Sequence, residues 1–236
     1  GSLVALVTPM TANGRVDVPS LRKLVRWHIN EETNGLVLLG TTGESSCLSH
    51  DEKTEMIKVV RSEVGCSIPL IVGTGSIDTK QTIESTKFAS DLGADAAMIV
   101  TPYYVKPTQS GLYNHFVSVA DSSNVPIILY NVPSRTGVDL SIETTIALSR
   151  HPNIYGLKDA TADLERVGLI RSVCGKDFKL YSGDDATACD FVLNGGDGVI
   201  SVTANVAPQK VSKMVRYAQS GMQSKAKKID KELVFL

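Results

Sequence analysis

Eight short apolar runs recur along the chain, and a longer segment with helical periodicity follows each of them. Most runs are rich in Val, Ile and Leu and are closed by Gly, Thr, Pro or Asn. They lack the alternation of apolar and polar residues that a half-exposed sheet shows, so they fit strands buried on both faces of a parallel sheet. The runs cover residues 3–7, 35–39, 70–73, 96–100, 127–131, 154–158, 179–182 and 198–202.

The segments between the runs open with residues that favour helix N-termini. Eight strand–helix units in this length predict a (β/α)8 TIM barrel, an α/β fold, and a doubly wound open sheet fits the count of eight less well. We assign residues 1–221 to the barrel and residues 222–236 to the start of a C-terminal helical region that we expect to be truncated. The predicted helix starts are Pro19-Ser20, Ser49, Asp78, Ser110, Ser141, Asp163, Asp184-Asp185 and Pro208.

Charge and composition disfavour several classes of protein. The 24 Lys and Arg residues nearly balance the 25 Asp and Glu residues, and no basic stripe of the kind that binds nucleic acid is present. No apolar run approaches the ~18 residues of a membrane span. The four cysteines form no C-x-x-C pair and have no zinc-ligand spacing. We therefore expect free thiols, no metal site and a cytoplasmic location.

Lys158 ends the sixth apolar run. A TIM barrel carries its active site at the carboxyl ends of its strands, so this lysine would point toward the barrel mouth. Burial there lowers the pKa of an amine because it disfavours the charged form. A neutral amine can attack a carbonyl group and form an imine. The simpler alternative is that Lys158 forms an ion pair with Asp159.

Other strand ends carry groups suited to proton transfer and to binding an anion. Tyr130 ends the fifth run, where its phenol could move protons or could be an ordinary aromatic of the barrel rim. Tyr103 and Tyr104 are adjacent, so they point to opposite sides and at most one faces the local site. Arg135 lies in a Pro/Ser/Gly-rich turn, where it could hold a carboxylate or lie free on the surface.

Two further groups of residues follow strands. Gly40-Thr41-Thr42-Gly43 offers backbone N–H groups and hydroxyls to a carboxylate, and it lacks the P-loop pattern. The pair Asp184-Asp185 could hold magnesium, but its place at a predicted helix start favours capping. None of the four histidines ends a strand, so none is assigned to catalysis.

Taken together and in this order, the strand-end motifs carry a family resemblance. They are GTTGES at 40–45, TPYY at 101–104, YNVPSRTG at 130–137, GLKDAT at 156–161, SGDD at 182–185 and GVISVTANV at 198–206. The chain resembles the dihydrodipicolinate synthase (4-hydroxy-tetrahydrodipicolinate synthase) family, within the pyruvate-dependent lyase superfamily that includes N-acetylneuraminate lyase. The likeness extends from Gly1 to about residue 230.

The resemblance implies a catalytic role for four residues. Lys158 matches the Schiff-base lysine that binds pyruvate. Tyr130 matches the tyrosine that passes protons to and from the imine. Thr41 matches the threonine that links two tyrosines in a proton relay. Tyr104 matches the relay tyrosine that reaches into the neighbouring subunit's site, so the implied catalytic unit is a dimer.

The resemblance also implies a substrate-binding set. Thr42 matches a residue that binds the carboxylate of pyruvate, and Arg135 matches the arginine that holds the carboxylate of aspartate semialdehyde. Gly183 and the carbonyl of Ile200 match positions that line the site. No metal or organic cofactor is implied, because the imine on Lys158 itself acts as the electron sink.

The implied reaction condenses pyruvate with L-aspartate 4-semialdehyde to 4-hydroxy-tetrahydrodipicolinate, on the route to diaminopimelate and lysine, in a homodimer or homotetramer. One alternative is another class I pyruvate aldolase, such as N-acetylneuraminate lyase or a 2-keto-3-deoxy sugar acid aldolase. Arg135 disfavours it, because a second carboxylate suits a small dicarboxylic product. The other alternative is a catalytically impaired paralogue or a keto-acid-binding protein, against which the intact Lys158 and Tyr130 argue.

Two departures from the family pattern are visible. Family members continue into a C-terminal region of several helices, and this chain ends as that region starts, so we expect reduced stability or assembly. Many members are also inhibited by lysine, and His50 and Tyr103 match that inhibitor site. At the other positions of that site, Lys53, Ile77 and Gln81 stand where the pattern has histidine, asparagine and glutamate. We therefore predict weak or absent inhibition by lysine.

Overall fold

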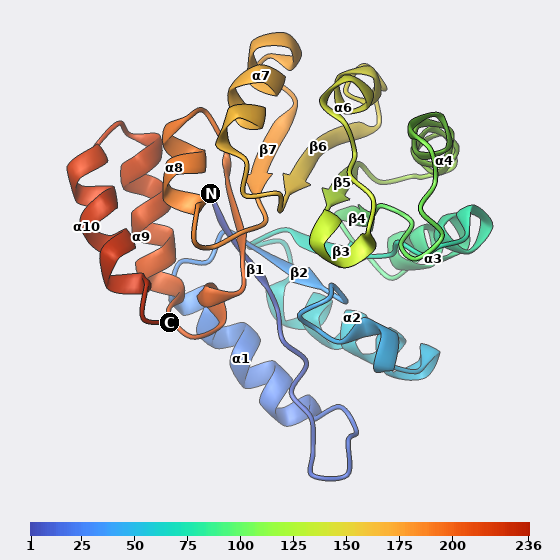
Figure 1. The fold of residues 1–236 in the computed structure, drawn as a ribbon. Helices are drawn as coiled ribbons and strands as arrows, with labels where there is room; N and C mark the ends of the chain where they lie inside the picture. The colour runs from blue at the N-terminus through green and yellow to red at the C-terminus, as the bar shows by residue number, and fades with distance from the viewer.

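The computed structural model describes residues 1–236 and shows a closed barrel of eight parallel strands (Figure 1). Each strand pairs with the next in sequence, and the eighth pairs with the first. The predicted TIM barrel is therefore confirmed. The strands are β1 Ser2–Ala5, β2 Gly35–Leu38, β3 Leu70–Gly73, β4 Ala96–Val100, β5 Ile127–Asn131, β6 Ile154–Asp159, β7 Lys179–Ser182 and β8 Gly198–Ser201.

Four of the predicted strand ranges have the observed bounds, namely those of β3, β4, β5 and β7. The others differ by one or two residues at an end. β2 ends early because Leu39 has a φ of +55°, in the left-handed region that a bulky side chain rarely adopts. That residue turns the chain out of the sheet at the edge where the site was predicted.

Helices surround the barrel and cover its outer face (Figure 1). A short helical turn, α5, occupies the segment that we predicted as a Pro/Ser/Gly-rich turn, and Pro133 at its first position favours helical φ there. The helices are α1 Val18–Asn30, α2 His50–Val64, α3 Thr79–Asp91, α4 Gln109–Asp121, α5 Pro133–Thr136, α6 Ile142–Leu148, α7 Leu164–Cys174, α8 Ala188–Leu193, α9 Pro208–Gln219 and α10 Gln223–Leu233, with 3-10 turns η1 Ser45–Cys47 and η2 Thr203–Asn205.

Side-chain caps set most of the helix starts. Ser49 and Glu52 form a capping box at the start of α2. Asp78, Ser141 and Asp163 accept backbone N–H groups at the starts of α3, α6 and α7, as predicted. These caps satisfy N–H groups that have no partner inside the helix.

Three predicted helix starts were wrong. The cap of α1 is Asp17 rather than Pro19-Ser20, and the cap of α4 is Thr108 rather than Ser110. The pair Asp184-Asp185 does not cap α8, whose N-cap residue, Thr187, makes no side-chain capping bond. The two carboxylates instead bond the loops that follow β7 and β8.

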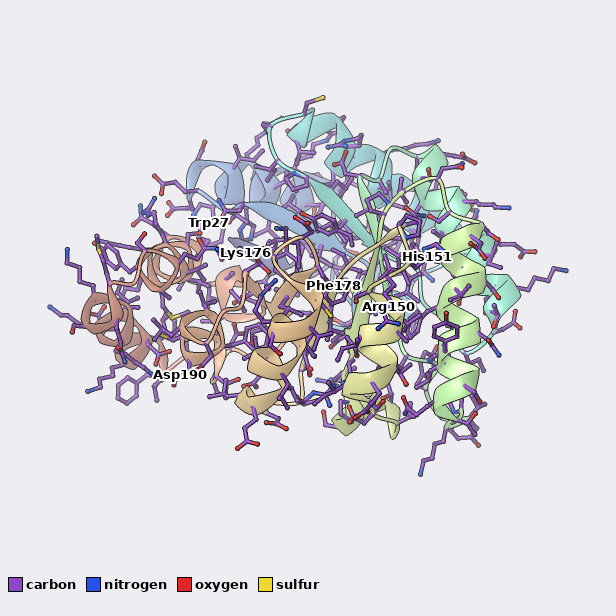
Figure 2. All side chains as sticks on the ribbon, turned by 90° about the horizontal axis from the view of Figure 1, so that it is seen from above. Trp27, Arg150, His151, Lys176, Phe178 and Asp190 are labelled. Atoms are coloured by element: carbon purple, nitrogen blue, oxygen red, sulfur yellow. The ribbon has the colours of Figure 1, made fainter.

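The core lies in two layers. Inside the barrel, residues such as Val37, Ile128 and Tyr130 pack together, and a larger apolar layer fills the space between the strands and the helices. Seen from above, long polar side chains project outward from the helices into the solvent (Figure 2). None of the helices is both long and apolar enough to cross a membrane.

The last helix, α10, packs against α9, and its only fully buried residue is Ala226. Lys227 of α10 forms an ion pair with Asp190 of α8. A left-handed glycine, Gly221, lies between α9 and α10, at a φ of +70° that favours glycine.

Candidate active site

A cavity of about 300 Å³ opens at the carboxyl ends of β2 to β5. This is the edge where a TIM barrel carries its active site. Three of the predicted site residues line it, namely Thr41, Tyr130 and Arg135, and the side chain of Tyr103 lines it as well. The remaining lining residues are Leu39, Gly40, Ser45, Ser46, Gly73, Gly75, Met98, Val100, Val132 and Thr136.

Lys158 lies beside this cavity, near the end of β6, with only 5% of its surface exposed. Its Nζ is 4.4 Å from the centroid of the Tyr130 ring. Burial lowers the pKa of the amine to about 8, although the carboxylate of Asp185 opposes the fall. At neutral pH a useful fraction of the amine is therefore unprotonated and able to attack a carbonyl group.

The alternative of an ion pair between Lys158 and Asp159 is wrong. The Asp159 carboxylate accepts hydrogen bonds from the Arg166 Nε at 2.9 Å and from the Thr161 N–H at 3.0 Å. Successive residues of a strand point to opposite faces, so Lys158 faces the barrel interior while Asp159 faces the helices. Lys158 has no carboxylate within ion-pair distance.

The phenol of Tyr130 is 6% exposed and ends β5 beside Lys158, with which it is in register. Burial raises the pKa of the phenol, while the nearby Arg135 guanidinium and Thr41 hydroxyl oppose the rise. Tyr130 therefore keeps its proton at neutral pH and can donate it to a developing anion. The interpretation of Tyr130 as a mere rim residue does not account for this contact with a buried amine.

Gly183 and Ile200 complete the surroundings of Lys158. A Cβ on Gly183 would lie 2.8 Å from the Cβ of Ala160 and 3.1 Å from the Cε of Lys158. Any side chain there would displace the lysine, so the close approach requires glycine. Ile200 lies in β8 and packs in the same interior cluster as Tyr130. Neither residue lines the 300 Å³ cavity.

The loop after β2 brings hydroxyls and backbone groups to the cavity. Gly43 has no room for a side chain, because a Cβ would lie 2.9 Å from the carbonyl oxygen of Leu6. The Thr8 hydroxyl donates a 2.6 Å hydrogen bond to the Gly43 carbonyl and fixes the loop on the segment that follows β1. Thr41 faces the cavity, whereas Thr42 is half-buried and does not line it.

The two adjacent tyrosines separate as predicted. Tyr103 lines the cavity and is 41% exposed, whereas Tyr104 is 87% exposed and lies outside it. Tyr104 has a φ of +68°, a conformation that is costly for a bulky residue and accumulates at functional sites. Its N–H donates to the carbonyl of Thr136, which ties this loop to the helical turn α5. Within its own subunit, Tyr104 therefore does not meet Tyr130.

Arg135 lies on α5 with an exposed guanidinium at the rim of the cavity. No acid of the chain forms an ion pair with it. The guanidinium is thus free to hold a carboxylate that enters from solvent.

A second cavity of about 600 Å³ adjoins the first and shares Tyr103 with it. His50, Lys53 and Gln81 line it. Ile77 does not line it and is 43% exposed. Four of the five positions named from the sequence therefore lie around one cavity.

Sequence reasoning missed two groups near Lys158. Asp185, predicted as a helix cap, accepts the N–H groups of Val202 and Thr203 and affects the pKa of Lys158. Arg166 is buried behind β6 and was not singled out. The sequence did contain one signal for Arg166. Asp159 is an acid directly after the reactive lysine in a buried strand, and a buried carboxylate needs a partner.

Comparisons with known proteins identify the family of the chain. The model of the dihydrodipicolinate synthetase family matches residues 1–236. The 4-hydroxy-tetrahydrodipicolinate synthase of Methylococcus capsulatus is 52% identical over 99% of this chain and 80% of its own length.

Two solved structures are similar to the chain as well. One is the chloride-inhibited dihydrodipicolinate synthase of Acinetobacter baumannii complexed with pyruvate, with a TM-score of 0.96, 50% identity and coverage of 98% of this chain and 79% of that one. The other is the enzyme of Cyanidioschyzon merolae with lysine bound, with a TM-score of 0.95, 37% identity and coverage of 99% and 80%. The family model matches every residue of the chain, and about half of the positions are identical in a curated member. The chain therefore belongs to the dihydrodipicolinate synthetase family.

Proposed function

We propose that the chain condenses pyruvate with L-aspartate 4-semialdehyde to form 4-hydroxy-tetrahydrodipicolinate, as a Schiff-base-forming lyase of lysine and diaminopimelate biosynthesis. The observation that carries the proposal is a buried Lys158 amine against the Tyr130 ring at the mouth of the barrel. Family membership supports the same reaction, since curated members at about half identity carry this activity.

The first half of the reaction takes place on Lys158. Its unprotonated amine attacks the C2 carbonyl of pyruvate, and one water leaves as the imine forms. The protonated imine draws electrons from the methyl carbon, which loses a proton and becomes the nucleophilic carbon of an enamine. Tyr130 is placed to give and take the protons of these steps.

The second half joins the two substrates. The enamine carbon attacks the aldehyde of the second substrate, and the aldehyde oxygen takes a proton and becomes the hydroxyl group. The amino group of the same substrate then attacks the imine carbon, closes the ring and releases the Lys158 amine. The sum is the two substrates less one water, and the enzyme returns unchanged.

The remaining roles follow the family pattern. Thr41 carries protons between Tyr130 and Tyr104 of a neighbouring subunit, because Tyr104 points away from its own cavity. Thr42 binds the carboxylate of pyruvate with the loop after β2. Gly183 and the Ile200 carbonyl bound the space around the imine.

We further propose the assembly, domain organisation and compartment. The catalytic unit is a homodimer, alone or paired into a homotetramer, because the relay tyrosine, Tyr104, lies outside the cavity that holds Thr41 in its own subunit. Residues 1–221 form the catalytic barrel, and residues 222–236 form a separate helical segment that packs on α9. Four unpaired cysteines are consistent with a cytoplasmic protein.

Substitution of Arg135 with methionine is expected to raise the KM for aspartate semialdehyde by about 10- to 100-fold, since a charged hydrogen bond is worth roughly 1.5–3 kcal/mol. The rate of pyruvate adduct formation should stay within about twofold, because the guanidinium serves the second substrate. Steady-state kinetics with each substrate varied in turn measures both effects.

A matched control for that substitution is Arg150→Met, which removes an exposed guanidinium at the end of α6 (Figure 2). It should leave both constants unchanged. An equal loss of apparent affinity for pyruvate in Arg135→Met would contradict the assignment of Arg135 to the second substrate.

Lysine is expected to inhibit the enzyme weakly or not at all. In the 600 Å³ cavity, Lys53 adds a positive charge, and Gln81 supplies no carboxylate to a cationic amine. Half-inhibition by submillimolar lysine would contradict this expectation. The double substitution Lys53→His with Gln81→Glu should restore sensitivity, and titration of the turnover rate with lysine compares the two proteins.

The proposed reaction is tested by mixing the protein with both substrates and weighing the products by mass spectrometry. We expect one product whose mass is that of both substrates less one water, formed only when both are present. Faster consumption of pyruvate with a polyhydroxylated aldose than with aspartate semialdehyde would instead identify a sugar acid aldolase.

A further inference from the structure

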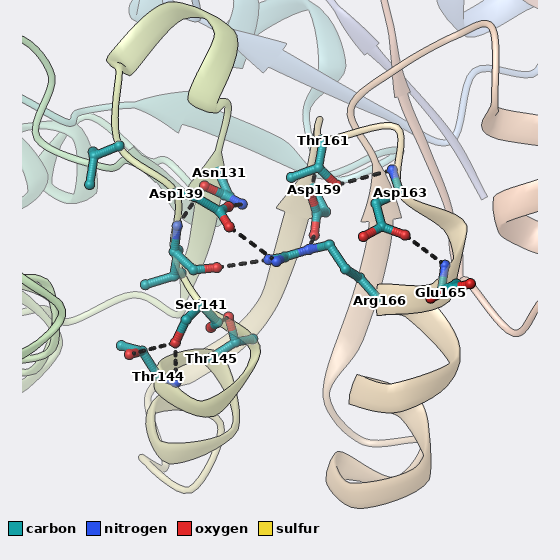
Figure 3. A network of polar contacts seen from close by, with 12 residues as sticks. Asn131, Asp139, Ser141, Thr144, Thr145, Asp159, Thr161, Asp163, Glu165 and Arg166 are labelled. Atoms are coloured by element: carbon teal, nitrogen blue, oxygen red, sulfur yellow. Dashed lines mark hydrogen bonds and ion pairs between the residues drawn. The ribbon is translucent and has the colours of Figure 1, made fainter.

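A buried network of hydrogen bonds lies on the outer side of β5 and β6, the strands that carry Tyr130 and Lys158. Arg166, the third residue of α7, is 7% exposed and reaches between the ends of β5 and β6 (Figure 3). Its Nε donates to Asp159 at 2.9 Å, and its two terminal nitrogens donate to Asp139 at 3.3 Å and to the carbonyl of Leu140 at 2.7 Å. One guanidinium thus joins α7, the end of β6 and the segment between α5 and α6.

The network continues onto β5. Asn131 is fully buried and donates from its amide to the Asp139 carboxylate at 2.7 Å, while its amide oxygen accepts the Leu140 N–H at 3.0 Å. Its backbone carbonyl accepts the N–H of Ala160 at 2.9 Å. The ends of β5 and β6 are therefore fastened to the same segment through side chains and backbone alike.

Strand register connects this network to the site. Tyr130 pairs with Lys158, and the next pair along the same two strands is Asn131 with Asp159. Because successive strand residues face opposite sides, the first pair meets inside the barrel and the second pair meets outside it. The outer pair belongs to the Arg166 network, so any shift of that pair moves the inner pair with it.

The network also reaches the residue directly after a third strand, β7. The backbone carbonyl of Asp159 accepts the Gly183 N–H at 2.7 Å. A Cβ atom added to Gly183 would lie only 3.1 Å from the Cε of Lys158, so the glycine packs closely against the lysine side chain. The position of Asp159 therefore sets both the strand that carries Lys158 and the glycine that packs against its side chain.

We infer that Arg166 is a positioning residue for the reaction, acting through Asp159 and Asn131 to hold Lys158 and Tyr130 at the separation that imine chemistry needs. This inference rests on the proposed function, because it assumes that Lys158 forms the imine. Arg166 itself lies on the outer side of the strands and touches no substrate. Arginine suits the place, since its planar fork donates to three acceptors at once.

The test is the rate at which pyruvate forms an adduct that borohydride can trap. In Arg166→Met, the rate at saturating pyruvate should fall by about 10- to 100-fold, since a misplacement near 1 Å has effects of that order. The pyruvate concentration at half-maximal rate should change by less than about threefold, since the proposed binding site for the pyruvate carboxylate lies on the loop after β2, away from Arg166. Arg166→Lys should recover part of the rate.

Arg171→Met is the matched control. Arg171 lies on the same helix, pairs with Asp197 and donates to backbone carbonyls, including that of Phe178 just before β7, away from Lys158. Its loss should lower the melting temperature as Arg166→Met does, with the trapping rate within about twofold of the unsubstituted protein. If both variants slow trapping equally, or Arg166→Met traps at the original rate, the inference is overturned.

One outcome separates this inference from the proposed function. Failure of the unsubstituted protein to form any adduct would count against the Lys158 imine itself. If Arg166→Met does not fold, Asp159→Asn decides, since it keeps the side-chain shape and removes the charge that Arg166 holds. Trapping by a folded Asp159→Asn at the original rate would overturn the positioning role, and a slower rate with unchanged half-saturation would support it.

Discussion

Replacement of Lys158 with methionine is expected to abolish turnover while it stabilises the fold. Without the amine no imine can form, and loss of an enzyme's nucleophile lowers kcat by roughly 10⁴-fold or more. The buried amine has its pKa lowered to about 8, so protonated Lys158 costs up to about 3 kcal/mol of stability. Active sites commonly carry such a cost, and its removal raises the melting temperature.

The gain in stability should depend on pH in a defined direction. Below pH 8 the lysine is protonated in both the folded and the unfolded chain, and the full cost of burying the charge applies. Between about 8 and its ordinary value of 10.5 the folded amine loses its proton first, so the cost fades as the pH rises. The advantage of Lys158→Met should therefore be largest at neutral pH and vanish near pH 10.5.

Chemical denaturation at pH 7 and pH 10 measures that difference. Lys176→Met is the control, since Lys176 is exposed on the surface (Figure 2) and its loss should change neither stability nor turnover. A Lys158→Met protein that is less stable than the original at pH 7 would contradict the lowered pKa. One that still turns over at a tenth of the original rate would contradict the role of the amine.

Substitution of Tyr130 with phenylalanine is expected to lower kcat by about 10²- to 10³-fold, which is the usual contribution of a general acid–base group. The ring that packs on Lys158 remains, and only the hydroxyl is lost, so the fold and the KM values should change little. Burial raises the pKa of this phenol, and it therefore acts as a proton donor across the whole neutral range. Steady-state and single-turnover kinetics at neutral pH measure the effect.

Tyr181→Phe is the matched control for that loss. Tyr181 packs against the interior cluster of the barrel, but it does not line the 300 Å³ cavity. Its substitution should keep kcat within about threefold. Equal losses in the two variants would mean that the barrel needs phenol groups for structure and that Tyr130 has no special part in proton transfer.

Much of the barrel could be predicted from the sequence, because its strands are buried on both faces and appear as continuous apolar runs. The bounds of β3 and β4 follow directly, since glycine or threonine and proline close those runs. The end of β2 could not be predicted, because Leu39 adopts a left-handed conformation that its residue type does not signal. There the surrounding packing overrides local preference.

Helix starts show how local chemistry can mislead. Thr108 and Ser110 both have hydroxyls, and they lie 3.1 Å apart, but only Thr108 has the extended backbone that a cap requires. Asp185 lies with Asp184 at a predicted helix start, which suggested a cap. Its real partners, the N–H groups of Val202 and Thr203, are 17 and 18 residues away and meet it only because β7 and β8 are neighbours.

The same limit applies to the site. Lys158, Tyr130 and Arg135 could be found because each ends or follows an apolar run and has a reactive side chain. Arg166 could not be identified, because Asp159 signals only that some partner is needed, and the other partners of this arginine, Asp139 and Leu140, are 27 and 26 residues away. Such a network depends on which strands are adjacent and in which register, and only the closed barrel specifies both.

The central claim is that the Lys158 amine forms an imine with pyruvate. It is tested most directly by intact-mass spectrometry after the protein is incubated with pyruvate and borohydride, followed by peptide mapping. The account predicts one reduced pyruvate adduct per chain, located on Lys158, forming faster as the pH rises and levelling off near the lysine's pKa of about 8. The absence of an adduct, or an adduct on any other lysine, would contradict it.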